Sequence, residues 1–276
     1  MKKLIITTFI ALALFETTLL GSDLKVLSFD DVKWEPLNPL RGDKSPQAAP
    51  LWGGLNSNVS TAFLVKFRDG FSSPPHIHNV TYRGVVISGL VHNDDPDAAH
   101  LWMPTGSFWT QPAGEVHITA AKGESNIAYI EIDHGPYLVK PASEAFDNGE
   151  RPVNIDQRNL VWLDAKDIIW VDQGGVRVSF LWGERAEGQF NGTMIMLPKG
   201  FDGQIHSDGK LFKAVIIQGQ VAHLSEDLDR ATKLIPGSYF GAEGKAIHPI
   251  SSDLQQETLI YVRTNGKMKI ISNANT

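Results

Sequence analysis

Short apolar runs with alternating polar positions recur along the chain and are separated by glycine and proline. Examples are residues 61–67, 84–89, 127–132, 212–217 and 258–263. Runs of this length that are rich in β-branched residues predict strands of an antiparallel sandwich or barrel. No segment shows an apolar stripe at helical spacing over three turns or more. The pattern therefore predicts an all-β protein.

A set of glycine and histidine positions occurs twice along the chain, which indicates an internal repeat. At a shift of 130 or 131 residues, the matched pairs are Gly70 and Gly200, His76 and His206, Gly89 and Gly219, Gly106 and Gly237, and His117 and His248. A unit of this length indicates one duplicated domain, because solenoid repeats are only about 20–50 residues long. The copies differ where His78 and Tyr82 of the first correspond to Asp208 and Phe212 of the second.

The repeat predicts two domains that follow an N-terminal targeting segment. Residues 1–22 begin with Met-Lys-Lys, continue with an apolar stretch and end at Gly21-Ser22, which is typical of a secretory signal peptide. We expect the first domain at residues 23–140, a polar linker at 141–158 and the second domain at 159–276. The predicted location is periplasmic or secreted, and the absence of cysteine fits passage into an oxidising compartment.

The first copy is six residues longer than the second between two landmarks that both copies share. The landmarks are Trp34 and Leu51 in the first copy, and Trp170 and Leu181 in the second. The extra residues fall within 36–50, a stretch that contains four prolines. This composition predicts an irregular loop.

The charge of the chain limits the classes of partner. The formal net charge is −6 at pH 7, and after the N-terminal segment no basic run is longer than two residues. This balance argues against binding to nucleic acid or to anionic lipid. No later segment is long and apolar enough to span a bilayer. We therefore expect a mature protein that binds no nucleic acid and no membrane, and whose partner is a small-molecule substrate or ligand.

Three histidines of the first copy have the spacing of a metal site. His76 and His78 lie two positions apart, so on a strand both imidazoles point to the same face. His117 follows two Pro-x-Gly turns, which place it to supply a third imidazole from a neighbouring strand. Three neutral imidazoles on one side of a divalent ion leave its other positions to water, substrate or dioxygen. The sequence therefore predicts an open metal site formed by His76, His78 and His117.

Together these motifs resemble those of the cupin superfamily. The first cupin motif, Gly-x5-His-x-His-x3–4-Glu-x6-Gly, and the second, Pro-x-Gly-x5-Pro-x-Gly-x2-His, are met by Gly70, His76, His78, Gly89, Pro104, Gly106, Pro112, Gly114 and His117. The resemblance covers nearly the whole mature chain and implies two tandem cupin-type barrels, each a double-stranded β-helix or jelly roll. More narrowly, the chain resembles an uncharacterised group of bacterial secreted two-cupin proteins. Dimers through sheet edges are common among cupins, so the resemblance makes a homodimer one candidate, while the sequence itself leaves the oligomeric state open.

One departure from the cupin pattern affects the expected chemistry. The glutamate ligand of the first motif falls at Tyr82. The remaining three-histidine set is similar to that of cupin dioxygenases that cleave β-diketones with ferrous iron. The resemblance therefore implies a divalent metal, with Fe(II) preferred and Mn, Ni or Zn as alternatives. It also implies oxygen-dependent cleavage, or isomerisation, of a small carbonyl or enolate compound. A neutral ligand trio leaves the ion's charge uncompensated, which favours anionic bidentate substrates.

Two further residues of the first copy are candidates for a catalytic role. Glu115 lies two positions before His117, on the same predicted face, and could act as a base or as a hydrogen-bond partner of a ligand. The alternative for Glu115 is a solvated residue at a strand end. The hydroxyl of Tyr82 could donate a hydrogen bond to a bound oxygen atom. The alternative for Tyr82 is an aromatic core residue, because its counterpart in the second copy is Phe212.

The second copy offers a weaker candidate site at His206, Asp208 and His248. Two histidines and one carboxylate form the ligand set of many non-haem iron enzymes. However, Glu243 and Lys245 stand where the first copy has Pro112 and Gly114, so a decayed site that is retained for packing is the alternative.

Three hypotheses for the whole protein follow from these patterns. The first is a secreted, metal-dependent bicupin enzyme that acts through the three-histidine site. The second is a module of cupin fold that binds or senses a small molecule or a metal without catalysis. The third is a structural envelope protein with vestigial sites.

Overall fold

Antiparallel β-strands make up most of the regular structure, which confirms the all-β prediction. The computed structural model describes residues 23–172, 174–224 and 231–273. The predicted signal peptide lies outside the described residues. The helical segments within the described ranges are short 3-10 turns: η1 (Phe29–Asp31), η2 (Pro39–Lys44), η3 (Ala142–Glu144) and η4 (Gln157–Asn159). None of them has the length and apolar character that a membrane span requires.

The first barrel is built from a seven-stranded sheet, in the order β10-β7-β6-β8-β4-β3-β2, and a two-stranded sheet of β5 and β9. Its strands are β2 (Glu35–Pro36), β3 (Gln47–Trp52), β4 (Thr61–Phe67), β5 (His76–His78), β6 (Tyr82–Asp94), β7 (Phe108–Gln111), β8 (Ile118–Ile132), β9 (Val139–Pro141) and β10 (Val153–Ile155).

Two long strands close this barrel. β6 and β8 pair along most of their length, and the register shifts twice, on either side of Ser88. Gly89 follows with φ +75°, and a Cβ at this position would lie 2.1 Å from Oδ1 of Asn126, so glycine allows the bend. Beyond the bend, residues 90–94 of β6 pair with residues 118–122 of β8, directly after His117, which an isolated bridge joins to His76. The bend therefore carries the strands to the side of the barrel where the three histidines lie.

The second barrel is built from a six-stranded sheet, in the order β1-β17-β14-β19-β12-β11, and a five-stranded sheet, in the order β16-β15-β18-β13-β20. Its strands are β1 (Asp23–Leu27), β11 (Arg177–Gly183), β12 (Asn191–Leu197), β13 (Asp202–Ser207), β14 (Leu211–Gln218), β15 (Val221–His223), β16 (Thr232–Leu234), β17 (Tyr239–Glu243), β18 (Ala246–Ser252), β19 (Thr258–Thr264) and β20 (Met268–Ser272).

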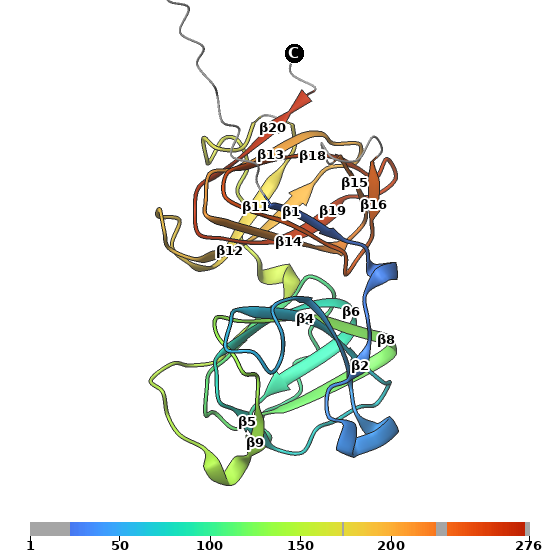
Figure 1. Ribbon diagram of the computed structural model, residues 1–276, viewed down its shortest axis with the longest axis vertical. Helices are drawn as coiled ribbons and strands as arrows, with labels where there is room; N and C mark the ends of the chain where they lie inside the picture. The colour runs from blue at the N-terminus through green and yellow to red at the C-terminus, as the bar shows by residue number, and fades with distance from the viewer. Residues whose placement is uncertain (1–22, 173, 225–230, 274–276) are drawn as a thin grey trace, which may run out of the picture.

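Two short strands pair with the barrel that the following part of their own repeat does not form. β1 precedes the first barrel in the chain but pairs with β17 of the second, with Leu27 opposite Tyr239. β10 lies in the predicted linker but pairs with β7 of the first barrel, with Ile155 opposite Phe108. Figure 1 shows β1, in blue, within the upper barrel. Each repeat therefore begins with an arm that completes the main sheet of the other barrel.

The outer faces of the two main sheets pack against each other. Both faces of β4 are buried. Ala62 and Leu64 face the cluster between the barrels, whereas Phe63 and Val65 face the interior of the first barrel. Burial on both faces explains why residues 62–65 of this strand are all apolar, where the sequence pattern predicted alternation. The cluster between the barrels includes Tyr261 and other residues of β19 and β14 from the second barrel.

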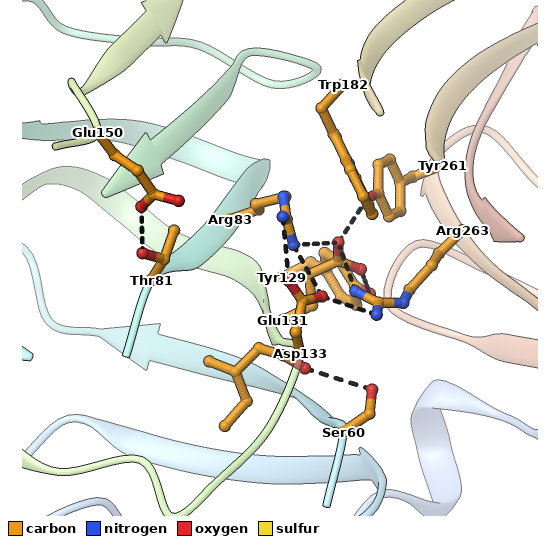
Figure 2. A network of polar contacts seen from close by, with 11 residues as sticks. Ser60, Thr81, Arg83, Tyr129, Glu131, Asp133, Glu150, Trp182, Tyr261 and Arg263 are labelled. Carbon is orange, nitrogen blue, oxygen red and sulfur yellow. Dashed lines mark hydrogen bonds and ion pairs between the residues drawn. The ribbon is translucent and has the colours of Figure 1, made fainter. Parts of the chain in front are cut away.

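A buried carboxylate also joins the two barrels. Glu131 on β8 is fully buried, and its oxygens accept hydrogen bonds from the hydroxyl of Tyr261 at 2.8 Å and from Nη1 of Arg263 at 3.3 Å, both on β19. The hydroxyl of Tyr129, in the first barrel, donates a further bond at 2.6 Å. Figure 2 shows these groups together with Asp133, which pairs with Arg263 at 2.8 Å.

Candidate metal centre

The structure brings His76, His78 and His117 together inside the first barrel. His76 and His78 are the first and last residues of β5, and their side chains point the same way because side chains alternate along a strand. His117 immediately precedes β8, and its backbone exchanges two hydrogen bonds with that of His76, at 3.0 and 3.1 Å. One nitrogen from each ring lies within 4.8 Å of the others. Nitrogen ligands at about 2.1 Å from one ion lie at most about 4.2 Å apart, so a small rotation of the rings suffices to hold a metal.

The hydrogen bonds of the rings leave nitrogens free for a metal. Nδ1 of His76 lies 2.9 Å from the carbonyl oxygen of Pro74, and Nδ1 of His117 lies 3.1 Å from that of Glu115. A carbonyl oxygen can only accept, so each Nδ1 carries the proton and each Nε2 keeps its lone pair. Metal-binding histidines usually have such a partner on the other nitrogen, which fixes the tautomer and the orientation of the ring.

Burial keeps all three imidazoles in the neutral form that binds metal. The exposed fractions are 9% for His76, 2% for His78 and 1% for His117. Burial lowers the pKa of each ring, and for His117, where the charge of His76 adds to the effect, the pKa falls to about 3. At neutral pH the trio is therefore uncharged and needs no deprotonation before it can bind a divalent ion.

Tyr82 reaches the centre through a chain of buried polar side chains. Its hydroxyl donates to Oδ1 of Asn93 at 2.7 Å and lies 3.3 Å from Nε2 of His117. Nδ2 of Asn93 donates to Gln111 at 2.8 Å, and Nε2 of Gln111 donates to the carbonyl of Glu115 at 3.3 Å, the same carbonyl that holds His117. Burial raises the pKa of Tyr82, so its phenol stays protonated and can donate a hydrogen bond.

Glu115 contributes its main chain to the centre. Its side chain lines a separate surface depression with Asp147 and Arg151, and it does not line the cavity of the three histidines. Burial raises the pKa of its carboxyl, and the charge of Arg151 opposes the change. A role in proton transfer for this carboxylate stays a prediction.

A cavity of about 130 Å³ opens onto His76, His78 and Tyr82. Most of its walls are apolar or aromatic, with Phe63, Val65, Phe67, Phe71, Trp109, Ile130, Tyr137 and Val139 among the lining residues. Tyr137 stacks on His78 with ring centroids 4.4 Å apart, and its hydroxyl lies 3.3 Å from Nε2 of that ring. Arg41 is the one acidic or basic side chain, apart from the histidines, among the described lining residues. A small organic molecule that enters this cavity would therefore meet His76, His78 and apolar walls.

The match to a family model covers both barrels. The model described as "Domain of unknown function (DUF4437)" matches residues 25–271. The chain belongs to this family. No curated protein matches the chain in sequence.

Solved structures resemble this member of the DUF4437 family over most of its length. A protein described as a candidate dioxygenase, from Nostoc punctiforme, has a TM-score of 0.67 at 14% identity, covering 92% of this chain and 87% of its own. Oxalate decarboxylase from Lactobacillus farciminis has a TM-score of 0.57 at 13% identity, covering 90% of this chain and 88% of its own. Salicylate 1,2-dioxygenase from Pseudaminobacter salicylatoxidans has a TM-score of 0.56 at 11% identity, covering 84% and 81%. These likenesses confirm the two-barrel cupin fold, whereas the reaction has to be argued from the site.

The second barrel of this DUF4437 member does not bring His206, Asp208 and His248 together. His248 pairs with Ile205, whereas its counterpart His117 pairs with His76. The register is therefore offset by one residue, which turns His206 to the outer face, where its ring bonds Gln204 at 2.8 Å. Asp208 is exposed and accepts from the backbone nitrogen of Lys267.

His248 instead belongs to the core of the second barrel. It is fully buried, stacks on Phe212 with ring centroids 4.6 Å apart, and its Nδ1 lies 3.3 Å from Nε2 of His223. Among the residues that the structure describes, His76, His78 and His117 form the one group of three or more side chains placed to hold a metal. The motif alone therefore identified the three histidines that lie together. The position of His248 agrees with the alternative that the second site has decayed and that its residues serve packing.

Reasoning from the sequence missed the residues around the trio. Asn93, Gln111 and Tyr137 bond or stack on residues of the site but belong to no motif. Asn93 corresponds to His223 at the repeat shift of 130 residues. Both copies therefore have a polar residue at this position, and that match could have marked Asn93 as a candidate. Tyr137 and Arg41 reach the cavity from loops, and their positions carried no such signal.

Proposed function

We propose that the protein is a ferrous-iron-dependent cupin dioxygenase that cleaves a small, enolisable carbonyl compound. The observation that carries the proposal is the ligand set: three buried, neutral imidazoles without a carboxylate, of which His76 and His78 line an apolar cavity of about 130 Å³. A neutral set leaves the charge of a divalent ion available to a chelating enolate. The dioxygenases among the structural neighbours support the same class of chemistry by analogy.

The overall reaction balances without an external reductant. With pentane-2,4-dione as the model compound, its enolate and one molecule of dioxygen give acetate and 2-oxopropanal. One carbon–carbon bond breaks, and each product receives one of the two oxygen atoms. A ferrous ion held by His76, His78 and His117 would supply the redox chemistry that brings the enolate and dioxygen to react.

The residues of the chain would bind and orient the substrate. The hydroxyl of Tyr137 lies beside Nε2 of His78, where it can donate a hydrogen bond to an oxygen of the substrate. The hydroxyl of Tyr82 lies beside Nε2 of His117 and can donate to the substrate when it turns away from Asn93, its present acceptor. The raised pKa of Tyr82, caused by burial, excludes it as a base near neutral pH. The apolar walls limit the access of water, which strengthens these hydrogen bonds.

Metal content and oxygen uptake test the proposal together. The mature chain is purified, its bound metal is measured by elemental analysis, and the protein is then loaded with Fe(II) without oxygen. We expect about one iron per chain, with oxygen uptake and formation of acetate and 2-oxopropanal when pentane-2,4-dione is added. His117→Ala should lose both metal and uptake. The matched control is His206→Ala, which changes the same residue type on the outer face of the other barrel and should retain both.

The outcomes separate the proposed enzyme from its alternatives. Tightly bound zinc with no oxygen uptake across a panel of diketones would contradict the oxygenase and support a module that binds a ligand or metal. Failure to bind any divalent metal after reconstitution would leave a structural role.

We also propose that the protein is exported to the periplasm or beyond. The support is the composition of residues 1–22, a basic start followed by an apolar stretch and a small-residue end. Expression of the full chain, followed by fractionation and N-terminal sequencing, tests this. Recovery of the uncleaved chain from the cytoplasm would contradict it.

A further inference from the structure

A loop that occurs in one copy of the repeat brings a cation to the mouth of the cavity. Residues 36–50 contain the six residues that the second copy lacks, and their tip is η2 (Pro39–Lys44). Arg41 lies in η2, is exposed, and lines the same cavity as His76 and Tyr82. The longer loop therefore occurs in the barrel that contains the three histidines and is missing from the barrel that lacks them.

The base and tip of this loop are held by specific hydrogen bonds. The backbone nitrogen of Leu37 donates to the carbonyl of Pro46 at 2.8 Å, which closes the base. The hydroxyl of Ser45 accepts from the backbone nitrogen of Asn38 at 2.9 Å, and the Asn38 side chain accepts from Leu40 at 3.1 Å to cap η2. These contacts fix the backbone that carries Arg41.

The charge of Arg41 has no partner of opposite sign within the described parts of the chain. No carboxylate of these residues forms an ion pair with its guanidinium, and no Asp or Glu appears among the described residues that line the cavity. Arg83 and Arg263, by contrast, pair with Asp133 at 3.0 and 2.8 Å. Arg41 can therefore bind an anion without first breaking a bond within the protein.

The cavity also limits the size of what Arg41 can help to bind. Its volume of about 130 Å³ is close to that of engineered apolar cavities of about 150 Å³, which bind benzene. Phe67, Phe71 and Ile130 are among its apolar walls. A ligand of this size can contact the histidines at one end and reach the mouth of the cavity at the other.

We propose that the cavity selects small carbonyl compounds which carry a carboxylate at the end remote from the metal, and that Arg41 binds this carboxylate. The inference rests on the proposed function, because it assigns the substrate class of the same site. A guanidinium binds a carboxylate through two parallel hydrogen bonds, which fixes orientation as well as adding affinity. Neutral analogues of equal shape are bound more weakly.

Equilibrium binding to the nickel-loaded protein tests this inference without relying on turnover. The probes are 4,6-dioxoheptanoate, in which two methylene groups separate the carboxylate from the diketone that would chelate the metal, and its methyl ester, which carries no charge. Charge-assisted hydrogen bonds at a partly exposed site favour the acid by about tenfold at low ionic strength, and added salt should reduce this preference. Arg41→Gln should weaken binding of the acid by about tenfold and leave binding of the ester within about twofold.

The matched control is Lys44→Gln, which removes a cation of the same loop that does not line the cavity. It should leave both dissociation constants within about twofold of the wild-type values. Equal binding of acid and ester by the wild-type protein, or an unchanged affinity of Arg41→Gln for the acid, would overturn the inference. If binding depends on Arg41 but the iron-loaded protein takes up no oxygen, the carboxylate site stands and the oxygenase proposal fails.

Discussion

Glu131→Gln tests how strongly one buried carboxylate holds the two barrels together. Glu131 is fully buried and receives hydrogen bonds from Tyr129, Tyr261 and Arg263 (Figure 2). The side chain of Arg263 is only 2% exposed. The substitution keeps the shape of the side chain but removes its charge and places an amide donor among three donors.

The expected loss of stability follows from the partners that remain. Removing one member of a buried ion pair costs about 3–5 kcal/mol, because the other charge stays buried without compensation. Here Asp133 still pairs with Arg263 at 2.8 Å, and the amide oxygen of the new glutamine can still accept the bonds from Tyr261 and Arg263, although without the negative charge. Asp133 is 46% exposed, so its compensation is partly screened by solvent. We therefore expect a loss of about 2–3 kcal/mol in the free energy of unfolding.

Denaturant unfolding followed by tryptophan fluorescence and circular dichroism measures this loss. The matched control is Glu257→Gln, which neutralises the same residue type in an ion pair with Arg177 at 2.8 Å, with partners 39% and 45% exposed. Surface pairs of this kind contribute less than about 1 kcal/mol. If Glu131→Gln lowers the free energy of unfolding by no more than Glu257→Gln does, the buried hydrogen bonds of Glu131 do not stabilise the contact between the barrels.

Three further changes probe the centre and the cores. Tyr82→Phe should keep the fold and the metal, since phenylalanine occupies the equivalent position 212 of the second barrel. It should lower kcat because the hydroxyl donor is lost. An unchanged kcat would show that this hydroxyl takes no part in the reaction. Metal that binds only the folded state at 100 times its dissociation constant should add about 2.7 kcal/mol to the stability of the wild type. That gain should vanish in His78→Ala, and a persisting gain would show that another site holds the metal. The free energy of unfolding of the metal-free protein should fall as the pH drops from about 6.5 to 4. Burial lowers the pKa of His223 to about 4 and that of His248 to about 3, so the unfolded chain binds more protons in this range. His248→Leu should reduce the slope of the free energy of unfolding against pH by about 1.4 kcal/mol per pH unit. A slope equal to that of the wild type would show that His248 does not cause this dependence.

The repeated motif predicted the ligand trio because its spacing encodes local geometry. Residues two apart on one strand share a face, so His76 and His78 had to point together once β5 formed. The shift of 130 residues makes His206 the counterpart of His76, but His206 does not pair with His248 as His76 pairs with His117. Pairing of His248 with Ile205 offsets the strand by one residue, and a shift of one residue exchanges the two faces of a strand.

The sequence by itself determined the strands, the duplication and the three imidazoles, because alternation and motif spacing act over a few residues. Only the tertiary structure decided which arm completes which barrel, since β1 and β10 are short and can pair with any open sheet edge of suitable register. Tertiary structure also brought Arg41 and Tyr137 to the cavity and Arg263 to Glu131. These contacts join residues that are distant in the chain, and their free energy depends on burial and on opposing charge, which no local pattern records.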